Sequence, residues 1–198
     1  MPPLLKIADA DSQRTLGRLS HGDRGIDETV GYMFALIEHA ANREMIRIAA
    51  QDFTLNSPRE VYQFVKQSVI FKSDPPGVEM LQVPGRMIRL IQQNGYAHGD
   101  CDDSSMLVCA LLDHLRWRPV LIVVAVPSKT VNNRFGHIFA GAKKDDDGPL
   151  DRANVIPMDS QEDTGYGVWP RPCVDGNRDK CVPRTRIYER NVKAGVQW

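Results

Sequence analysis

The chain has 198 residues, of which 42% are hydrophobic and 25% are charged, proportions typical of a single globular domain. They exclude a disordered chain, a collagen-like fibre and a small disulfide-rich scaffold. Lys and Arg number 25, as do Asp and Glu, so the chain as a whole does not attract a polyanion. We therefore expect no nucleic acid partner.

From the sequence we expect neither membrane insertion nor classical export. Its longest apolar run, Val120–Val126, is far shorter than the about 20 residues that cross a bilayer, so we expect no membrane span. The first residues include no apolar stretch of signal-peptide length. Four cysteines are too few for a secreted fold held by disulfides. These features favour a cytoplasmic protein.

The first half of the chain predicts helices. Residues 1–25 are polar and indicate an arm, whereas apolar residues at three- and four-residue spacings predict one helix from Ile26 to about Phe53. Ser57–Glu60 then combines an N-cap serine, a proline in the first turn and a capping-box glutamate, which predicts the start of a second helix. That helix must end before the turn residues of Asp74–Gly77.

The second half changes from helical to strand periodicity. We expect a short helix around Met87–Gln93, a turn at Asn94-Gly95 and a longer helix over Cys101–Leu115. Three strands should follow, at Val120–Val126, Phe135–Gly141 and Ala153–Met158. Because helices precede a run of adjacent strands, the sequence predicts an α+β fold with N-terminal helices packed on an antiparallel sheet.

We divide the chain into three parts on this basis. Residues 1–55 form an N-terminal arm and helix, residues 56–171 the core domain, and residues 172–198 a C-terminal tail rich in Arg, Pro and Gly. We expect this tail to pack on another surface or to stay mobile.

Three residues in the core have the chemistry of a thiol-dependent catalytic site. Cys101 opens a predicted helix, where unpaired N–H groups and the helix dipole favour a thiolate. His137 lies in the following strand pair and could exchange a proton with the thiol. Asp159 ends the next strand, where a carboxylate could fix the orientation and tautomer of the imidazole.

The sequence around these residues resembles the transglutaminase-like (papain-like cysteine) superfamily. Residues 57–65 and 74–84 are similar to the segments that precede the catalytic cysteine in that family, and Gly99–Leu107 is similar to its nucleophile motif. Gly136–Ala140 resembles the histidine strand, and Ile156–Ser160 the aspartate strand. The motifs occur in the family's order over residues 56–170. Within the superfamily, the chain resembles short bacterial and phage-encoded members.

The resemblance implies a papain-like fold and cysteine-dependent acyl transfer or hydrolysis at an amide bond, through a thioester. Cys101 would be the nucleophile, His137 the base and acid, and Asp159 the residue that orients the histidine. The protein would be a peptidase, an amidase or a protein crosslinking enzyme that acts on a protein or peptide without a cofactor. Its location would be the cytoplasm of a bacterial host or a phage virion, with other particle proteins as partners. The alternative is a non-catalytic structural or interaction module, such as a phage particle component, that retains the fold.

Some features depart from the family's pattern. Animal transglutaminases need calcium, but Asp145–Asp147 are consecutive, whereas the ligands of a calcium loop usually alternate; we expect no metal. The backbone N–H of Cys101 is one candidate oxyanion donor, and Gln82 is our candidate for the second, with Gln92 and Gln93 as rivals. Acidic neighbours of the thiol, Asp100, Asp102 and Asp103, would disfavour a thiolate if they pointed toward it.

Other cysteines and histidines have simpler interpretations. His98 is a rival base for Cys101, although it lies only three residues away. Cys109 fits a core position on the predicted helix. Cys173 and Cys181 could be a reduced pair, a disulfide or half of a metal site, and the sequence leaves these alternatives open.

Overall fold

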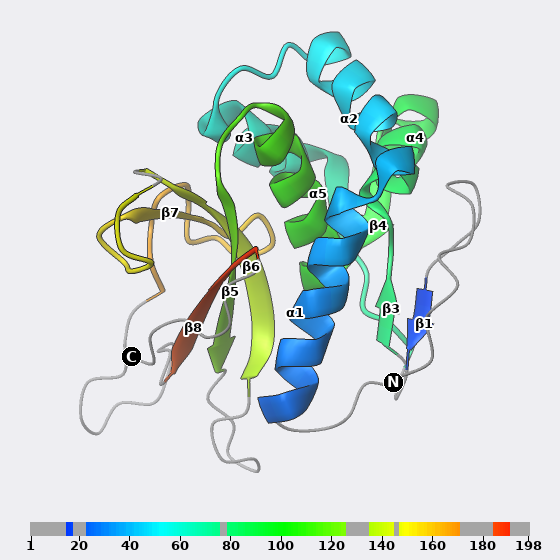
Figure 1. Ribbon diagram of the computed structural model, residues 1–198. Coiled ribbons are helices and arrows are strands. Elements are labelled where there is room, and N and C mark those ends of the chain that lie inside the picture. The colour runs from blue at the N-terminus through cyan, green and yellow to red at the C-terminus, as the bar shows by residue number, and fades with distance from the viewer. Residues whose placement is uncertain are drawn as a thin grey trace.

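A four-stranded antiparallel sheet packs against a group of helices in the computed structural model (Figure 1). The structure describes residues 15–17, 23–75, 79–125, 135–144, 147–170 and 184–190. The helices in these ranges are α1 (Asp23–Glu38), α2 (Ala40–Asp52), α3 (Pro58–Ser68), α4 (Pro84–Asn94) and α5 (Cys101–His114). The strands of the main sheet are β5 (Pro119–Ala125), β6 (Phe135–Lys143), β7 (Val155–Met158) and β8 (Thr185–Glu189).

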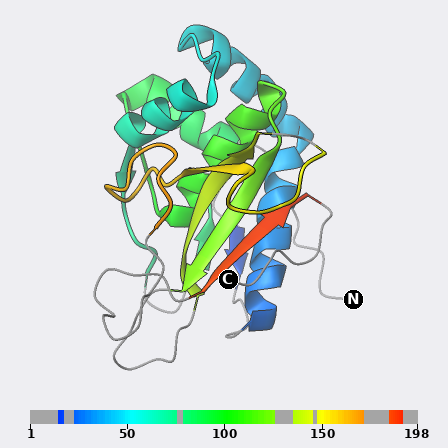
Figure 2. The same cartoon turned by 90° about the vertical axis from the view of Figure 1, so that its left-hand side faces the viewer.

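The main sheet has the strand order β7-β6-β5-β8, and every neighbouring pair is antiparallel. Viewed from the side of the sheet, β6, β5 and β8 run next to one another in front of the helices (Figure 2). This arrangement confirms the predicted α+β class and the antiparallel sheet.

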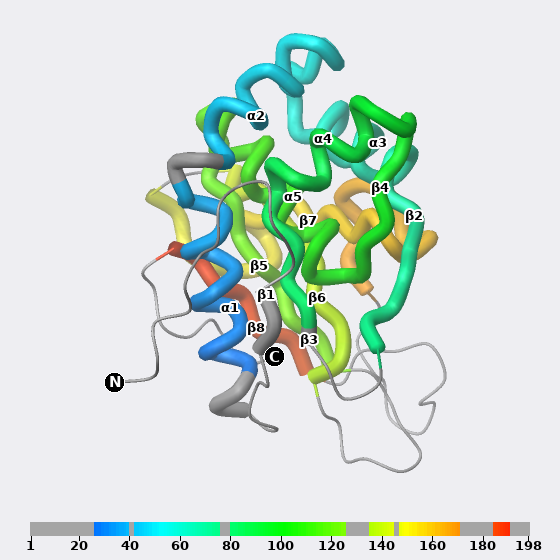
Figure 3. Tube along the Cα trace, turned by 90° about the vertical axis from the view of Figure 1, so that its right-hand side faces the viewer, coloured from blue at the N-terminus to red at the C-terminus, as the bar shows by residue number. Residues whose placement is uncertain are grey.

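Two small sheets add to this core. Strands β1 (Thr15–Gly17) and β3 (Glu79–Leu81) pair antiparallel, and β2 (Val69–Phe71) and β4 (Ala97–Gly99) pair in parallel. The β2–β4 pair lies on one flank of the molecule and α1 on the other (Figure 3). Since β4 ends one residue before the N-cap of α5, this small sheet leads the chain directly into the helix of Cys101.

Helix α5 lies at the centre of the fold. It contacts β5 and β6 on one side and α1, α2, α3 and α4 on the others, so every residue from Asp102 to Leu112 is buried. Strand β5 is also buried along its whole length. A second apolar cluster, which includes Phe139, Ile187 and the partly buried Trp169, covers the sheet face away from the helices. The continuous apolar runs of both elements follow from burial on all sides.

The predicted capping signal at the start of α3 is confirmed. The side chain of Ser57 accepts a hydrogen bond from the backbone N–H of Glu60 at 3.3 Å. The carboxylate of Glu60 in turn accepts from the backbone N–H of Asn56 at 2.8 Å. The turn expected after α4 is also present, because Gly95 has a left-handed φ of 83°.

The prediction of one continuous helix from Ile26 to about Phe53 was wrong. The chain leaves the helix at His39, between α1 and α2. The side chain of Asn42 explains the break, because its amide donates to the backbone oxygen of Leu36 at 2.7 Å and accepts from the N–H of Gly85 at 3.1 Å. Asn42 therefore ties the end of α1 to the start of α4, and local periodicity does not reveal a contact of this kind.

The C-terminal segment also differs from the prediction. Residues 172–198 were expected to be a tail, but Thr185–Glu189 forms β8, next to β5 in the main sheet. Ile187 is fully buried opposite Ile122. The boundary proposed at residue 171 therefore does not separate the core from the C-terminal segment. At the other end of the chain, α1 and α2 contribute to the same hydrophobic core as α5.

Among the residues that the structure describes, none of the helices has the length and hydrophobicity to span a bilayer.

Candidate active site

Cys101 lies at the first position of α5 and carries a free, partly exposed thiol. The chain enters the helix through Gly99, where a Cβ atom would lie 2.8 Å from the Cβ of Asp103. Only glycine allows this close approach without a shift of its neighbours. The thiol is therefore held where the unpaired backbone N–H groups of a helix N-terminus create a positive potential.

His137 and Asp159 come from neighbouring strands of the sheet. His137 lies near the start of β6, and Asp159 directly follows β7, which pairs with β6. The Nε2 atom of His137 is 2.7 Å from Oδ2 of Asp159. The other carboxylate oxygen of Asp159 accepts hydrogen bonds from the backbone N–H groups of Gln161 and Glu162, both at 3.2 Å. The carboxylate is thus fixed on both sides, and it is 2% exposed.

The surroundings of His137 favour its charged form. Burial opposes the positive charge, but hydrogen bonds to Asp159 and to Cys101 outweigh it and raise the pKa of His137 to about 10. Nε2 faces Asp159, and His137 also interacts with the side chain of Cys101. The structure thus brings the three residues singled out in the sequence together, with His137 between the thiol and the carboxylate.

Ser105 joins the helix of Cys101 to the strand of His137. Its buried hydroxyl contacts the carbonyl oxygen of Cys101 at 2.5 Å and that of Ile138, next to His137, at 3.2 Å. A single hydroxyl proton serves two carbonyl groups here, one on each element. The sequence analysis did not single out Ser105, although a serine four residues after a helical nucleophile can reach that residue's carbonyl.

Gln161 makes a second connection between the two halves of the site. Its side-chain amide donates to the hydroxyl of Ser104, which itself donates to the carbonyl oxygen of Asp100 at 2.8 Å. This chain of hydrogen bonds links the loop that carries Asp159 to the first turn of α5. Gln161 was also missed in the sequence.

Gln82, the candidate oxyanion donor, is buried and hydrogen-bonded at several atoms. Its amide nitrogen donates to the carbonyl oxygen of His98 at 2.9 Å and to Oδ2 of Asp103 at 3.2 Å. Its backbone N–H donates to Oδ1 of Asp103 at 2.5 Å. Both amide hydrogens therefore have acceptors in this arrangement, and Gln82 would have to release one of them to donate to a substrate.

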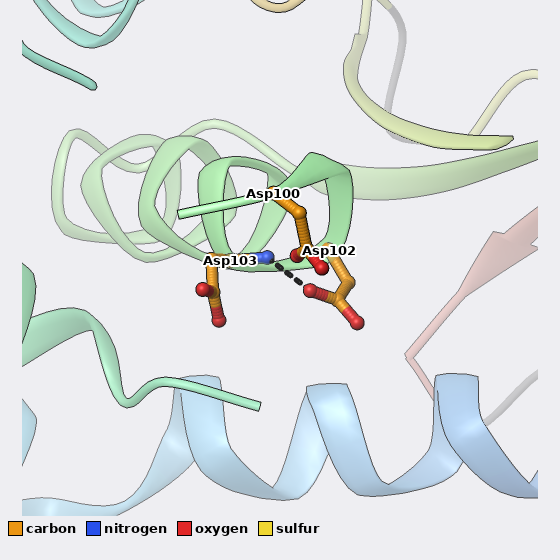
Figure 4. A group of neighbouring side chains, drawn as sticks. All are labelled: Asp100, Asp102 and Asp103. Carbon is orange, nitrogen blue, oxygen red and sulfur yellow. Dashed lines mark hydrogen bonds between the residues drawn. The ribbon is translucent and has the colours of Figure 1, made fainter. Parts of the chain in front are cut away.

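Three carboxylates gather at the N-terminus of α5 (Figure 4). Asp100, Asp102 and Asp103 each place one oxygen within 4.8 Å of the others. The carboxylate of Asp102 accepts from the backbone N–H of Asp103 at 2.7 Å. Burial, together with the charge of Asp100, raises the pKa of Asp103 to about 7, although hydrogen bonds from Gln82 oppose the shift. A large share of Asp103 is therefore neutral near pH 7, which reduces the negative charge beside Cys101.

The alternative candidates for the base and for the oxyanion donor are exposed side chains on β4 and α4. His98 is exposed on β4, where its ring packs edge-on against Tyr96. Gln92 and Gln93 are exposed on α4, and Gln92 bonds to Asp52.

Of the other cysteines, Cys109 is fully buried within α5, where burial raises the pKa of its thiol. Cys173 and Cys181 lie outside the described residues, as does part of the 145–147 aspartate run.

Comparison with known proteins adds no relative. No protein-family model matches the chain, and no curated protein matches it.

Proposed function

We propose that this protein is a cysteine-dependent enzyme that transfers or hydrolyses acyl groups at amide bonds. One observation carries the proposal: His137, whose Nε2 is 2.7 Å from the buried carboxylate of Asp159, also interacts with Cys101, and both neighbours raise the pKa of its imidazole. A thiol, an imidazole and a carboxylate in this order form the hydrogen-bonded chain of a nucleophile, its base and an orienting group.

The proposed reaction has two steps. The Cys101 thiolate attacks the carbonyl carbon of an amide, and His137 gives its proton to the leaving nitrogen as the C–N bond breaks and a thioester forms. Water or a second amine then attacks the thioester and loses a proton to His137, and the C–S bond breaks. The product is a carboxylic acid with water, or a new amide with an amine.

Asp159 stabilises the imidazolium whenever His137 is protonated and orients the neutral imidazole between the two steps, because its carboxylate lies beside Nε2. The backbone N–H of Cys101, at the start of α5, is the first donor that we assign to the oxyanion. Gln82 is the second, once one of its hydrogen bonds to His98 or Asp103 opens.

The same residues support membership in the transglutaminase-like superfamily, with a papain-like core, as part of this proposal. The motifs around Cys101, His137 and Asp159 carry it, since the order of an N-terminal nucleophile helix followed by histidine and aspartate strands fits the order α5, β6 and β7. A protein or peptide is the proposed substrate.

Trapping of the thioester tests this function. The purified protein would be incubated with a library of glutamine-containing peptides and a labelled primary amine, quenched in acid and mapped by peptide mass spectrometry. We expect an acyl adduct on Cys101, together with either free acid or labelled peptide as product. Cys101→Ala should abolish both, whereas Cys109→Ala, the matched control, should retain them.

The products also separate the alternatives. New N-termini identify a peptidase, release of ammonia without amine label an amidase, and incorporation of the amine a crosslinking enzyme. Absence of any adduct on Cys101 together with unchanged peptides would contradict the proposal and favour the non-catalytic module.

A further inference from the structure

A cavity of about 690 Å³ lies at the opposite end of α5 from Cys101. Residues at the C-terminal end of α5, from α1 and α2, and at the ends of β5 and β8 line it. Its volume is that of sites that hold small organic molecules. Helix α5 has 14 residues, so the thiol and the cavity lie toward opposite ends of a helix about 20 Å long.

The lining of this cavity is rich in arginine. Arg43, Arg116, Arg118 and Arg190 all contribute to it, with Asp113 and Glu189 as the acidic lining residues. Four guanidinium groups around one cavity form a typical arrangement for binding oxyanions, because each offers several N–H donors in a planar fork.

The acidic groups nearby are already paired. Arg118 and Lys143 contact the carboxylate of Glu189, at 3.2 and 3.5 Å. Arg190 contacts Asp113 at 3.2 Å and also Glu38.

Arg43 and Arg116 have no such partner. Neither forms an ion pair or a side-chain hydrogen bond with any residue in the described ranges. Two positive charges at the cavity therefore have no counter-ion among the residues that the structure describes.

Arg116 is also held in a backbone conformation that favours glycine. Its φ is 66°, and it follows the C-cap of α5, with its N–H bonded to the oxygen of Asp113 and that of Trp117 to the oxygen of Leu112. This pattern is a Schellman motif, in which the residue with positive φ is usually glycine. An arginine at this position is less favourable for the backbone than glycine, and Arg116 is one of the residues that line the cavity.

Apolar side chains complete the cavity. Trp117 lines it and packs against the main hydrophobic core, and Ile37 and Ile46 line it from α1 and α2. A ligand that combines an anionic group with an apolar or aromatic part would therefore have contacts for both parts.

We propose that this cavity binds a small organic dianion, such as a phosphate monoester with an aromatic substituent. Arg43 and Arg116 bind the dianionic group, and Trp117 contacts the organic part. The proposal does not depend on the activity of Cys101, because the two sites share no residue.

Calorimetric titration of the full chain tests the proposal, with phenyl phosphate as the probe. At pH 7.5 the phosphate group is largely dianionic, since its second pKa is about 6. We expect phenyl phosphate to bind more tightly than inorganic phosphate or phenol, and its affinity to fall as the NaCl concentration rises. Arg43→Gln and Arg116→Gly should each weaken binding about tenfold or more.

Two variants separate a loss of the binding site from a loss of stability and from a general loss of positive charge. Arg116→Gly replaces a strained residue by the one that its backbone favours, so the variant should keep or raise the melting temperature while it loses affinity. Arg47→Gln lies on the same helix as Arg43, outside the cavity lining and paired with Glu44, and it should bind like the wild type. No binding of phenyl phosphate, equal binding of inorganic phosphate, or unchanged affinity in Arg43→Gln and Arg116→Gly would overturn the proposal.

Discussion

Replacement of Asp159 by asparagine removes one charge from the candidate site and nearly preserves the shape of the side chain. In the wild type, the pKa of His137 rises from an ordinary value of about 6.5 to about 10. A difference of this size corresponds to about 5 kcal/mol in favour of the imidazolium. Cys101 contributes to the shift as well as Asp159. We assign Asp159 about 3 kcal/mol, the lower end of what removal of one partner from a buried ion pair costs.

The pH dependence of this loss follows from the sign of the shift. Because the folded pKa of His137 lies above the unfolded one, its stabilising contribution is fully present below about pH 6.5. The contribution then disappears as the pH rises through about 10. The difference in the free energy of unfolding between wild type and Asp159→Asn should therefore be large at pH 6 and much smaller at pH 10.

Urea denaturation at the two pH values measures this difference, and NMR titration of the histidine ring protons measures the pKa directly. Asp163→Asn is a suitable control, since Asp163 lies in the same loop but its side chain is fully exposed. Asp159→Asn should lower the pKa of His137, and Asp163→Asn should not. An equal loss of stability at pH 6 and pH 10, with an unchanged histidine titration, would refute the electrostatic role of Asp159.

Three further substitutions test the surroundings of the site. Ser105→Ala removes the hydroxyl that contacts the carbonyl oxygens of Cys101 and Ile138, so urea denaturation should show a loss of about 1 kcal/mol, and alkylation of Cys101 should slow; an unchanged alkylation rate would exclude a positioning role. Gly99→Ala should lower the free energy of unfolding by about 1–3 kcal/mol, because the new Cβ would lie 2.8 Å from that of Asp103; an unchanged denaturation midpoint would show that the backbone adapts. Burial and the charge of Asp100 raise the pKa of Asp103 to about 7, so the contribution of Asp103 to stability should fall as the pH rises from about 4 to about 7, because this carboxyl ionises first in the unfolded chain. Asp103→Asn should eliminate a carboxyl ¹³C resonance that titrates near pH 7, and titration of every wild-type carboxyl below pH 5 would contradict this assignment.

Long elements with clear periodicity were predictable from the sequence. The helix expected over Cys101–Leu115 is α5, and the three expected strands are β5, β6 and β7. Strands β2 and β4 were missed because each has three residues, too few for a periodic signal. They also pair residues that lie far apart in the sequence, such as Val69 and Ala97. Strand β8 was missed because its apolar residues occur in a segment otherwise rich in Arg, Pro and Gly.

In the candidate site, too, some features were predictable from local sequence and others depend on contacts between distant segments. The residue types and their order along the chain, together with the resemblance of the surrounding segments to transglutaminase-like motifs, singled out Cys101, His137 and Asp159. The supporting contacts were not predictable, since they join segments far apart in sequence: Ser105 reaches Ile138, 33 residues away, and Gln161 reaches Ser104, 57 residues away. Such contacts are set by how the helix packs on the sheet rather than by any local pattern.

The rate of Cys101 alkylation by iodoacetamide as a function of pH, in wild type and His137→Ala, tests the central claim most directly. If a thiolate–imidazolium pair exists, Cys101 should react near its maximal rate at pH 6, and His137→Ala should slow this reaction about tenfold or more. Buried Cys109 should stay unmodified in both proteins. A rate that instead rises up to the ordinary thiol pKa of about 8.5, and that does not change in His137→Ala, would contradict the account.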